Sequence, residues 1–330
     1  MFDQTLGNAD RLGAHAIPAV DCADAAQRIQ DFLKTTVRKL NRRGCVLGVS
    51  GGVDSAVCVT LAVQALGPER VLALLMPERD IADDGEMRAR RLCESLGIRF
   101  VIEEISAPLD ALGCYLRRDA AIRTLFPEYG IGWRQKIAVA GGGGWTSHFN
   151  LIVQTPKGQV LERRMPAEVY LQVVAATNFK QRIRKNLEYF YAESHNYAVL
   201  GTPNRLEYQL GFFVRGGDGL ADLKPIAHLY KTQVYQLAEY LGVPEEICSQ
   251  PPSTDTYSLP QTQEEFYFAL PYGEADQVLY GISRSIGVEA IAKSLGRPLT
   301  QVVHVVRDFE RKRQAAQRTL RDAYLLEEHP

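Results

Sequence analysis

The chain has 330 residues, 46% of them hydrophobic, which is enough apolar material to bury the core of one large domain or two. Its 38 basic and 39 acidic side chains leave a net charge of −1, which argues against a nucleic-acid partner and disfavours tRNA as a substrate. The sequence has neither an Arg-rich or apolar leader nor a run of about 18 apolar residues. We therefore expect no membrane association and a cytoplasmic location.

The cysteines are also typical of a cytosolic protein. All six lie far apart without a C-x-x-C pair, and most fall in apolar segments: Cys22, Cys45, Cys58, Cys93, Cys114 and Cys248. Reduced, buried thiols are the better interpretation of this pattern than a catalytic or metal-binding role.

Helix and strand patterns alternate in the first third of the chain. Apolar side chains at helical spacing predict helices over 23–42, 56–66 and 86–96, and short apolar runs predict strands over 45–49, 71–76 and 98–102. Three strand-to-helix units of this kind predict an α/β fold with a doubly wound, Rossmann-like parallel sheet covered by helices on both faces. Ligands bind such sheets at the C-terminal ends of their strands.

The turn after the first strand reads Ser50-Gly51-Gly52-Val53-Asp54-Ser55. Its glycines leave backbone N–H groups accessible to an anion, and the helix N-terminus that follows attracts phosphate. The turn lacks the lysine of a Walker A loop and the G-x-G-x-x-G spacing of a dinucleotide site. It resembles the pyrophosphate loop of the N-type ATP pyrophosphatases, which implies cleavage of ATP between its α and β phosphates and adenylation of a substrate oxygen.

The middle of the chain departs from the alternating pattern. Four glycines at 141–144 interrupt it, and residues 149–162 alternate around Pro156-Lys157-Gly158 in the manner of a β-hairpin. We therefore expect an insertion at about 126–165, which is either a plain linker or a flap that covers a substrate. A long helix over 167–196 and a strand over 197–201 then resume the pattern.

Acidic residues and a lysine follow that strand. Glu207 comes after a Gly201–Asn204 turn, and Asp218 and Asp222 lie in a Gly-rich loop. Facing a phosphate loop, such carboxylates suit Mg²⁺, although a solvated acidic loop is the alternative for each one singly. Lys231 falls in the first turn of a predicted helix, where it opposes the helix dipole, so a phosphate partner explains it as well as a surface position does.

Taken together, the motifs resemble those of the ammonia-dependent NAD⁺ synthetases over about residues 42–276. The matching residues beyond the loop keep the family's order and approximate spacing: Asn178, Arg182, Arg184, Gly201, Thr202, Asn204, Glu207, Gly211, Phe213, Asp218, Asp222, Lys231, Ser253, Asp255, Tyr272 and Asp276. The resemblance implies a homodimeric enzyme that adenylates nicotinic acid adenine dinucleotide with ATP and Mg²⁺ and then amidates it with ammonia.

The resemblance also implies roles for individual residues. ATP would contact Gly48, Ser50, Gly51, Gly52, Asp54, Ser55, Met76, Thr202, Lys231 and Ser253. Mg²⁺ would be held by Asp54, Glu207 and Ser253. The carboxylate substrate would meet Asn178, Arg182, Arg184, Arg215, Asp218 and Asp222. Catalysis would fall to Lys231 on phosphate and to Asp218 or Asp222, which could bind ammonium and accept its proton.

For the domain organisation, we expect one α/β domain over 1–281 that carries the insertion, and a helical C-terminal extension over 282–330 packed on the same domain. About forty residues precede Cys45, too few for a glutaminase domain, so we expect free ammonia or a separate glutaminase as the nitrogen source.

Three alternatives stay open. Arg215-Gly216 stands where the family commonly has an aromatic residue preceded by lysine, so the amidated acid could be a different carboxylate from a specialised biosynthetic pathway. A sulfur-transfer or tRNA-modifying enzyme could use the same loop, but it would usually need a paired or exposed cysteine and a basic face. A regulatory protein without catalysis is disfavoured by the presence of Asp54, Glu207, Asp222 and Lys231.

Overall fold

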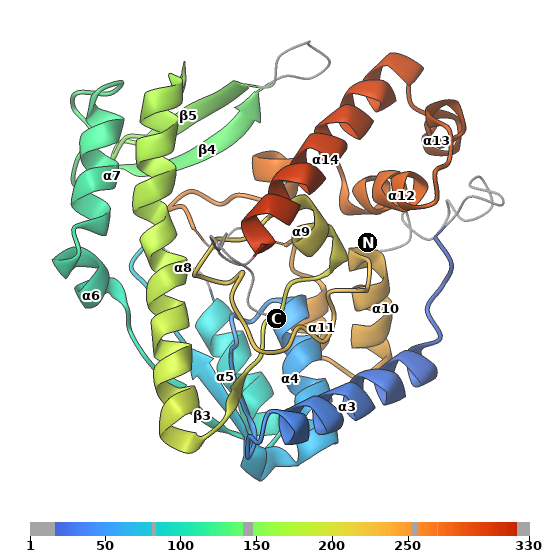
Figure 1. The fold of residues 1–330 in the computed structure, drawn as a ribbon. Helices are drawn as coiled ribbons and strands as arrows, with labels where there is room; N and C mark the ends of the chain where they lie inside the picture. Colours follow the sequence, from blue (N-terminus) through green and yellow to red (C-terminus); the bar gives the residue numbers. More distant parts are fainter. Residues whose placement is uncertain (1–16, 81–83, 141–147, 253–255, 269, 322–330) are drawn as a thin grey trace, which may run out of the picture.

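The computed structural model describes residues 17–80, 84–140, 148–252, 256–268 and 270–321 (Figure 1). Within these ranges the chain forms a parallel sheet of four strands in the order β3-β2-β1-β7. A second sheet of three antiparallel strands has the order β4-β5-β6. The strands of the parallel sheet are β1 (Cys45–Gly48), β2 (Val71–Leu75), β3 (Arg99–Ile102) and β7 (Ala198–Val199).

Both faces of the parallel sheet are buried. Along β1, Cys45 and Leu47 join one hydrophobic core while Val46 joins another, as the alternation of side chains along a strand requires. Helices α3 (Cys22–Lys39), α4 (Val53–Leu66), α5 (Gly85–Ser95) and α10 (Lys231–Tyr240) contribute to the first core. The second core takes side chains from α6 (Ser106–Ala111), α7 (Cys114–Arg123) and α8 (Ala167–His195). The expected doubly wound arrangement is confirmed.

Helix α4 begins three residues earlier than the sequence pattern predicts. The Gly-Gly turn masks the helix start in sequence, but Gly52 already has the extended conformation of an N-cap residue, with φ −91° and ψ 160°. Asp54 and Ser55 therefore lie in the first turn of the helix. At the other end Gly67 has φ +88°, where a side chain would be strained, and the chain leaves α4 for the 3₁₀ turn η2 (Pro68–Arg70).

The middle segment is a three-stranded sheet rather than an isolated hairpin. Strands β5 (His148–Gln154) and β6 (Val160–Arg164) form the expected hairpin, and β4 (Arg134–Ala140) pairs along the other edge of β5. Ile137, Leu151 and Val153 are fully buried in a core shared with α7 and α8. The sheet is thus a packed layer of the molecule. The glycines at 141–144 lie outside the described residues.

Helix α8 connects the two sheets. Its N-terminal part contributes Val169 and Val173 to the core of the antiparallel sheet, and further along Phe179 and Ile183 pack against the core of the parallel sheet. Figure 1 shows the helix running from the antiparallel sheet down to β3.

Most of the remaining helices form a third core. They are α9 (Arg205–Leu210), a short π-helix η3 (Glu264–Phe268), α12 (Tyr272–Ser283), α13 (Val288–Leu295) and α14 (Leu299–Leu320), whereas α11 (Glu245–Cys248) packs in the first core. Phe309 of α14 is fully buried beside Leu206 and Leu210 of α9, so the expected helical C-terminal region packs on the α/β part. The expected boundary at residue 281 falls inside α12. Among the described residues, no helix has the length and apolarity needed to span a membrane.

Candidate active site

A cleft of about 650 Å³ lies at the C-terminal ends of β1, β2 and β7. Strands β1 and β7 are neighbours, and the chain leaves β1 through α4 toward β2 on the opposite side. This is the switch point at which doubly wound sheets bind ligands. The Gly loop, α8, the loops after β2 and β7, the start of α10 and the segment around η3 line the cleft.

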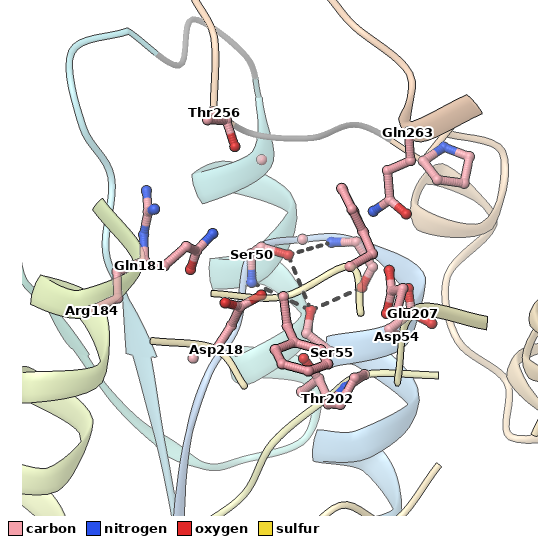
Figure 2. Close-up of a pocket in the computed structure, with 18 of the residues that line it drawn as sticks. Ser50, Asp54, Ser55, Gln181, Arg184, Thr202, Glu207, Asp218, Thr256 and Gln263 are labelled. Atoms are coloured by element: carbon pink, nitrogen blue, oxygen red, sulfur yellow. Dashed lines mark hydrogen bonds between the residues drawn. The ribbon is translucent and has the colours of Figure 1, made fainter. Parts of the chain in front are cut away.

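The Gly loop has the geometry of a phosphate site. Gly51 has φ +84°, and a Cβ there would come within 2.4 Å of the carbonyl oxygen of Gly85. Only glycine is compatible with this position. The Ser50 hydroxyl accepts a hydrogen bond from the Gly52 N–H at 3.2 Å, and the Ser55 hydroxyl donates to the Gly52 carbonyl at 2.9 Å (Figure 2). No side chain caps α4, so its N-terminal dipole faces the cleft without a carboxylate cap.

Two carboxylates and one ammonium meet beside the Gly loop. Asp54 on α4 forms an ion pair with Lys231, the first residue of α10, and accepts a hydrogen bond from the Asn204 side-chain amide at 3.2 Å. Glu207 on α9 accepts from the Asn204 backbone N–H at 3.1 Å, in a reciprocal capping box. Asn204 therefore contacts both acids, which Figure 2 shows side by side. The motif residues Asp54, Asn204, Glu207 and Lys231 are brought together by three different elements.

The lysine does not suffice to keep both acids ionised. Burial and the nearby Asp54 charge raise the pKa of Glu207 to about 8, although Lys231 acts in the opposite direction. Burial alone would lower the pKa of Lys231, but Asp54 and Glu207 outweigh it and raise that pKa to about 12. Without a metal ion, Glu207 therefore keeps its proton at neutral pH, and the Asp54 charge is matched by the Lys231 cation at the mouth of the phosphate loop.

This donor set fits a divalent cation shared with phosphate. Two mutually repelling carboxylates are the hard oxygen ligands that Mg²⁺ prefers, and it is commonly held by one or two of them together with substrate phosphates. No group of three or more His, Cys, Asp or Glu side chains suited to a metal occurs in the described ranges. The ion would therefore depend on ATP oxygens for the rest of its ligands. Ser253, the other expected ligand, lies outside the described residues.

A hydrogen bond from the neighbouring residue to Asp276 holds the first turn of α10, and with it Lys231, in place. Asp276 on α12 is fully buried and accepts a 2.8 Å hydrogen bond from the backbone N–H of Thr232, the residue after Lys231. A carboxylate at the N-terminus of α10 is favoured by the helix dipole, and it leaves the Lys231 side chain directed at Asp54.

The long helix α8 supplies one wall of the cleft. Thr177, Asn178, Gln181, Arg184, Lys185 and Glu188 recur three or four residues apart and all line the cleft. Lys185 and Glu188 form a buried ion pair at 2.5 Å. The Oε1 atom of Glu188 approaches the end of β1, since a Cβ on Gly48 would lie 3.2 Å from it. This pair was missed in the sequence, where opposite charges three residues apart on a helix usually mark a solvated face.

Asp218 faces the cleft and Asp222 does not. Burial raises the pKa of Asp218, partly offset by the hydrogen bond that its carboxylate accepts from the Val214 N–H at 2.7 Å. Asp222 instead accepts from the backbone N–H of Val199 at 2.8 Å and from Tyr189, and it is not among the cleft residues. The structure therefore corrects the pairing of these two carboxylates as equivalent candidates, because the loop points them in different directions.

Two of the expected arginines also point elsewhere. Arg182 and Arg215 are exposed and absent from the cleft lining, and the Arg182 side chain donates to the carbonyl oxygen of Arg215 at 3.3 Å. They therefore do not line this cleft, and their contact with the substrate stays a prediction. Asn178, Arg184, Gly48, Met76 and Thr202 do line the cleft, as expected (Figure 2 shows Arg184 and Thr202).

An aromatic surface on the far side of the cleft was not predicted. Tyr170 of α8 and Tyr257, Phe266 and Tyr267 of the segment near η3 line it. Tyr257 and Phe266 pack edge to face at 5.5 Å. Aromatic residues are more often core than site, and their sequence spacing alone gave no signal that they share a surface.

The thiols do not suit nucleophilic chemistry. All six cysteines are free, and four of them are buried. Burial raises the pKa of Cys45 to about 12, well away from the range of reactive thiols. This disfavours the sulfur-transfer alternative.

Known proteins resemble this chain in both sequence and fold. A family model described as NAD synthase matches residues 25–124 and 148–316. The NH3-dependent NAD⁺ synthetase of Rhizobium meliloti (strain 1021) is 51% identical over 299 residues, covering 90% of this chain and 89% of that protein. For the fold alone, a structure of NMN synthetase from Francisella tularensis aligns with a TM-score of 0.64 at 24% identity, covering 93% of this chain and 98% of that one. An NH3-dependent NAD synthetase from Campylobacter jejuni aligns with a TM-score of 0.61 at 24% identity, covering 93% and 100%.

Proposed function

This chain belongs to the NAD synthase family, and from that premise we propose that it amidates nicotinic acid adenine dinucleotide with ammonia, in a reaction driven by ATP. It is a ligase that forms a C–N bond, and ATP is its co-substrate. One observation in the structure supports the proposal above the others: a glycine loop at the start of α4 lies beside an Asp54, Glu207 and Lys231 cluster. These groups are suited to ATP phosphates rather than to any uncharged ligand.

In the first step a carboxylate oxygen of the dinucleotide attacks the α phosphorus of ATP. The bond from that phosphorus to the bridging oxygen breaks, and pyrophosphate leaves. We assign the leaving group to the N–H groups and hydroxyls of the Gly loop and to the Lys231 ammonium, because all of them line the cleft at the N-terminus of α4. Asp54 and Glu207 would hold Mg²⁺, which supplies neutralisation of phosphate charge when it is bound.

In the second step ammonia attacks the acyl carbon of the adenylate, and AMP leaves as the amide forms. The attacking nitrogen must lose a proton, and a carboxylate that faces the cleft is suited to accept it. Asp218 meets this condition and Asp222 does not, because the latter is bonded to the backbone of β7. We therefore assign ammonium binding and proton acceptance to Asp218. Asn178 and Arg184 on α8 are the remaining assignments for the substrate.

The test is a pyrophosphate-release assay with ATP, Mg²⁺ and ammonium, run with and without nicotinic acid adenine dinucleotide, with mass spectrometry of the products. Dinucleotide-dependent release accompanied by NAD⁺ and AMP is expected. A folded protein that binds ATP but releases pyrophosphate only with another carboxylate would contradict the assigned substrate and leave the ATP half of the site standing.

The assembly and surroundings follow from the same proposal. We propose a cytoplasmic homodimer that takes free ammonia or ammonia released by a separate glutaminase. Light scattering of the purified protein measures whether it is a dimer. The source of ammonia is tested by comparing the rates with ammonium and with glutamine, each with and without an added glutaminase.

A further inference from the structure

The aromatic side of the cleft is carried by residues 256–268, here called the wall segment. Its side chains Tyr257, Gln263, Phe266 and Tyr267 line the cleft, yet only its last five residues form a helix, η3. A segment with so little regular structure needs external contacts to hold aromatic rings in fixed positions.

Strand β4 supplies those contacts. The free edge of β4 follows the wall segment: the Gln135 N–H donates to the Ser258 hydroxyl at 2.8 Å, and the Leu259 N–H donates to the Gln135 carbonyl at 3.0 Å. The Gln261 side-chain amide donates to the Ile137 carbonyl. The wall segment therefore satisfies the edge groups that β4 leaves unpaired in its own sheet.

Side chains of β4 strengthen this attachment. The Arg134 guanidinium donates to the carbonyl of Ser258 at 2.8 Å. Lys136 forms a 2.6 Å ion pair with Glu265 inside η3, and both side chains are partly shielded from water. The antiparallel sheet also supports the cleft through β5, since Phe149 stacks on Tyr170 with ring centroids 4.2 Å apart.

The start of the wall segment is held from the opposite side. Lys180 on α8 is 1% exposed and donates to the Thr256 carbonyl at 2.7 Å, as well as to Glu78 at 2.6 Å and Asp80 at 2.8 Å. Its charge is matched by the two acids. The wall segment is thus fixed at one end by a buried cation and along its length by β4.

We propose that β4 is a positioning strand, which holds the wall segment so that its aromatic rings receive the planar ring of a bound nucleotide. The NAD synthase match breaks at residues 125–147, which include β4, so this support is an addition to the family's matched region. The ring belongs either to ATP or to the dinucleotide. This proposal rests on the proposed function in one respect, which is that the second nucleotide in the cleft is nicotinic acid adenine dinucleotide.

The test uses two variants that loosen the wall segment without touching the cleft. Ser258→Ala removes the hydroxyl that pairs with Gln135, and Lys136→Met removes the ion pair with Glu265. The matched control is Lys157→Met, on the exposed turn of the same sheet. A charge exchange, Lys136→Glu with Glu265→Lys, restores the ion pair. All assays are run at a temperature at which circular dichroism shows every variant to be folded.

We expect faster amide hydrogen exchange over 256–268 in both variants. The KM for ATP or for the dinucleotide should rise about fivefold, equivalent to about 1 kcal/mol, with kcat nearly unchanged. The control should match the wild type, and the charge exchange should recover most of the loss. The substrate whose KM rises identifies the ring.

Unchanged exchange, or faster exchange with both KM values unchanged, would overturn the proposal. A fall in kcat with no KM effect would overturn it as well. If wild-type protein makes no NAD⁺, the proposed function fails separately, and β4 is then judged by hydrogen exchange and by calorimetric titration with ATP alone. In that case faster exchange with weaker ATP binding supports the positioning role, and any other result rejects it.

Discussion

Asp218 and Asp222 lie four residues apart but have different surroundings. Asp218 lines the cleft with a carboxyl group whose pKa is raised by burial, whereas Asp222 accepts hydrogen bonds from Val199 of β7 and from Tyr189. A sequence motif cannot distinguish them, because the direction of each side chain depends on which backbone N–H groups the Gly-rich loop presents to it. Here the Val214 N–H binds the Asp218 carboxylate and the Val199 N–H binds the Asp222 carboxylate.

We therefore expect Asp218→Asn to lower kcat/KM for ammonia by tenfold or more, since an amide cannot accept the proton of the attacking nitrogen; general-base losses are typically about 10² to 10⁴. Raising the pH should partly restore the rate by supplying free ammonia. Asp222→Asn is the matched control, and it should change thermal stability more than ammonia use. Steady-state rates over a range of ammonium concentrations check both. Equal losses of kcat/KM for ammonia in the two variants would contradict the assignment.

Asp276 allows a prediction about pH and stability. Burial raises its pKa to about 6 from an ordinary value of 3.8, against the hydrogen bond from Thr232. Between these values the native state keeps a proton that the unfolded chain has lost, so stability falls as pH rises through this window. Asp276→Asn cannot titrate and keeps an acceptor for Thr232. Its stability relative to wild type should therefore increase from pH 4 to pH 6 by up to about 3 kcal/mol and then level off.

Urea unfolding of both proteins at several values of pH between 4 and 7 measures this difference directly. Other titrating groups contribute equally to the two proteins and cancel. A difference in unfolding free energy that does not vary with pH would show that Asp276 is ionised throughout, and that its buried carboxylate is better compensated than its surroundings indicate.

At the scale of elements, the predicted parts are those whose pattern is local. The apolar runs of β1 and β2 and the helical spacing of α3 are visible in sequence, because both faces of the sheet and one face of the helix are buried. Strand β4 was not predicted. Its partners are β5 and the wall segment more than a hundred residues later, and its first three residues, Arg134-Gln135-Lys136, are polar because they serve that contact.

The buried pair on α8 gives a prediction for that element. Lys185→Met leaves the Glu188 carboxylate buried without its cation and should cost about 3–5 kcal/mol. Glu188→Leu added to it removes the uncompensated charge, so the double variant should regain most of this loss. Chemical denaturation of the single and double variants measures the coupling. If the double variant is no more stable than Lys185→Met alone, the loss comes from packing rather than from the unpaired charge.

At the scale of the whole molecule, the parallel sheet and the antiparallel sheet share one helix. Sequence patterns indicate the positions of both sheets, but they predict the antiparallel sheet as an insertion in an otherwise complete domain. The structure joins them, because α8 contributes buried residues to both cores and the wall segment crosses from the C-terminal part to β4. That relation depends on contacts between distant segments, so it has no signature within any one of them.

This sharing predicts that the two sheets unfold together. Trp133 packs against the core of the antiparallel sheet, so the fluorescence of a Trp145→Phe variant, in which Trp133 is the remaining tryptophan, reports on that part while circular dichroism reports on all helices. We expect the two thermal transitions to coincide. Leu151→Ala in one core and Leu109→Ala in the other should each remove about 2–5 kcal/mol and lower both transitions equally, since each side chain is fully buried. A fluorescence transition that precedes the dichroism, or moves alone in Leu151→Ala, would make the antiparallel sheet a separate unit. The wall segment would then lose its contacts with β4 before the Gly loop unfolds.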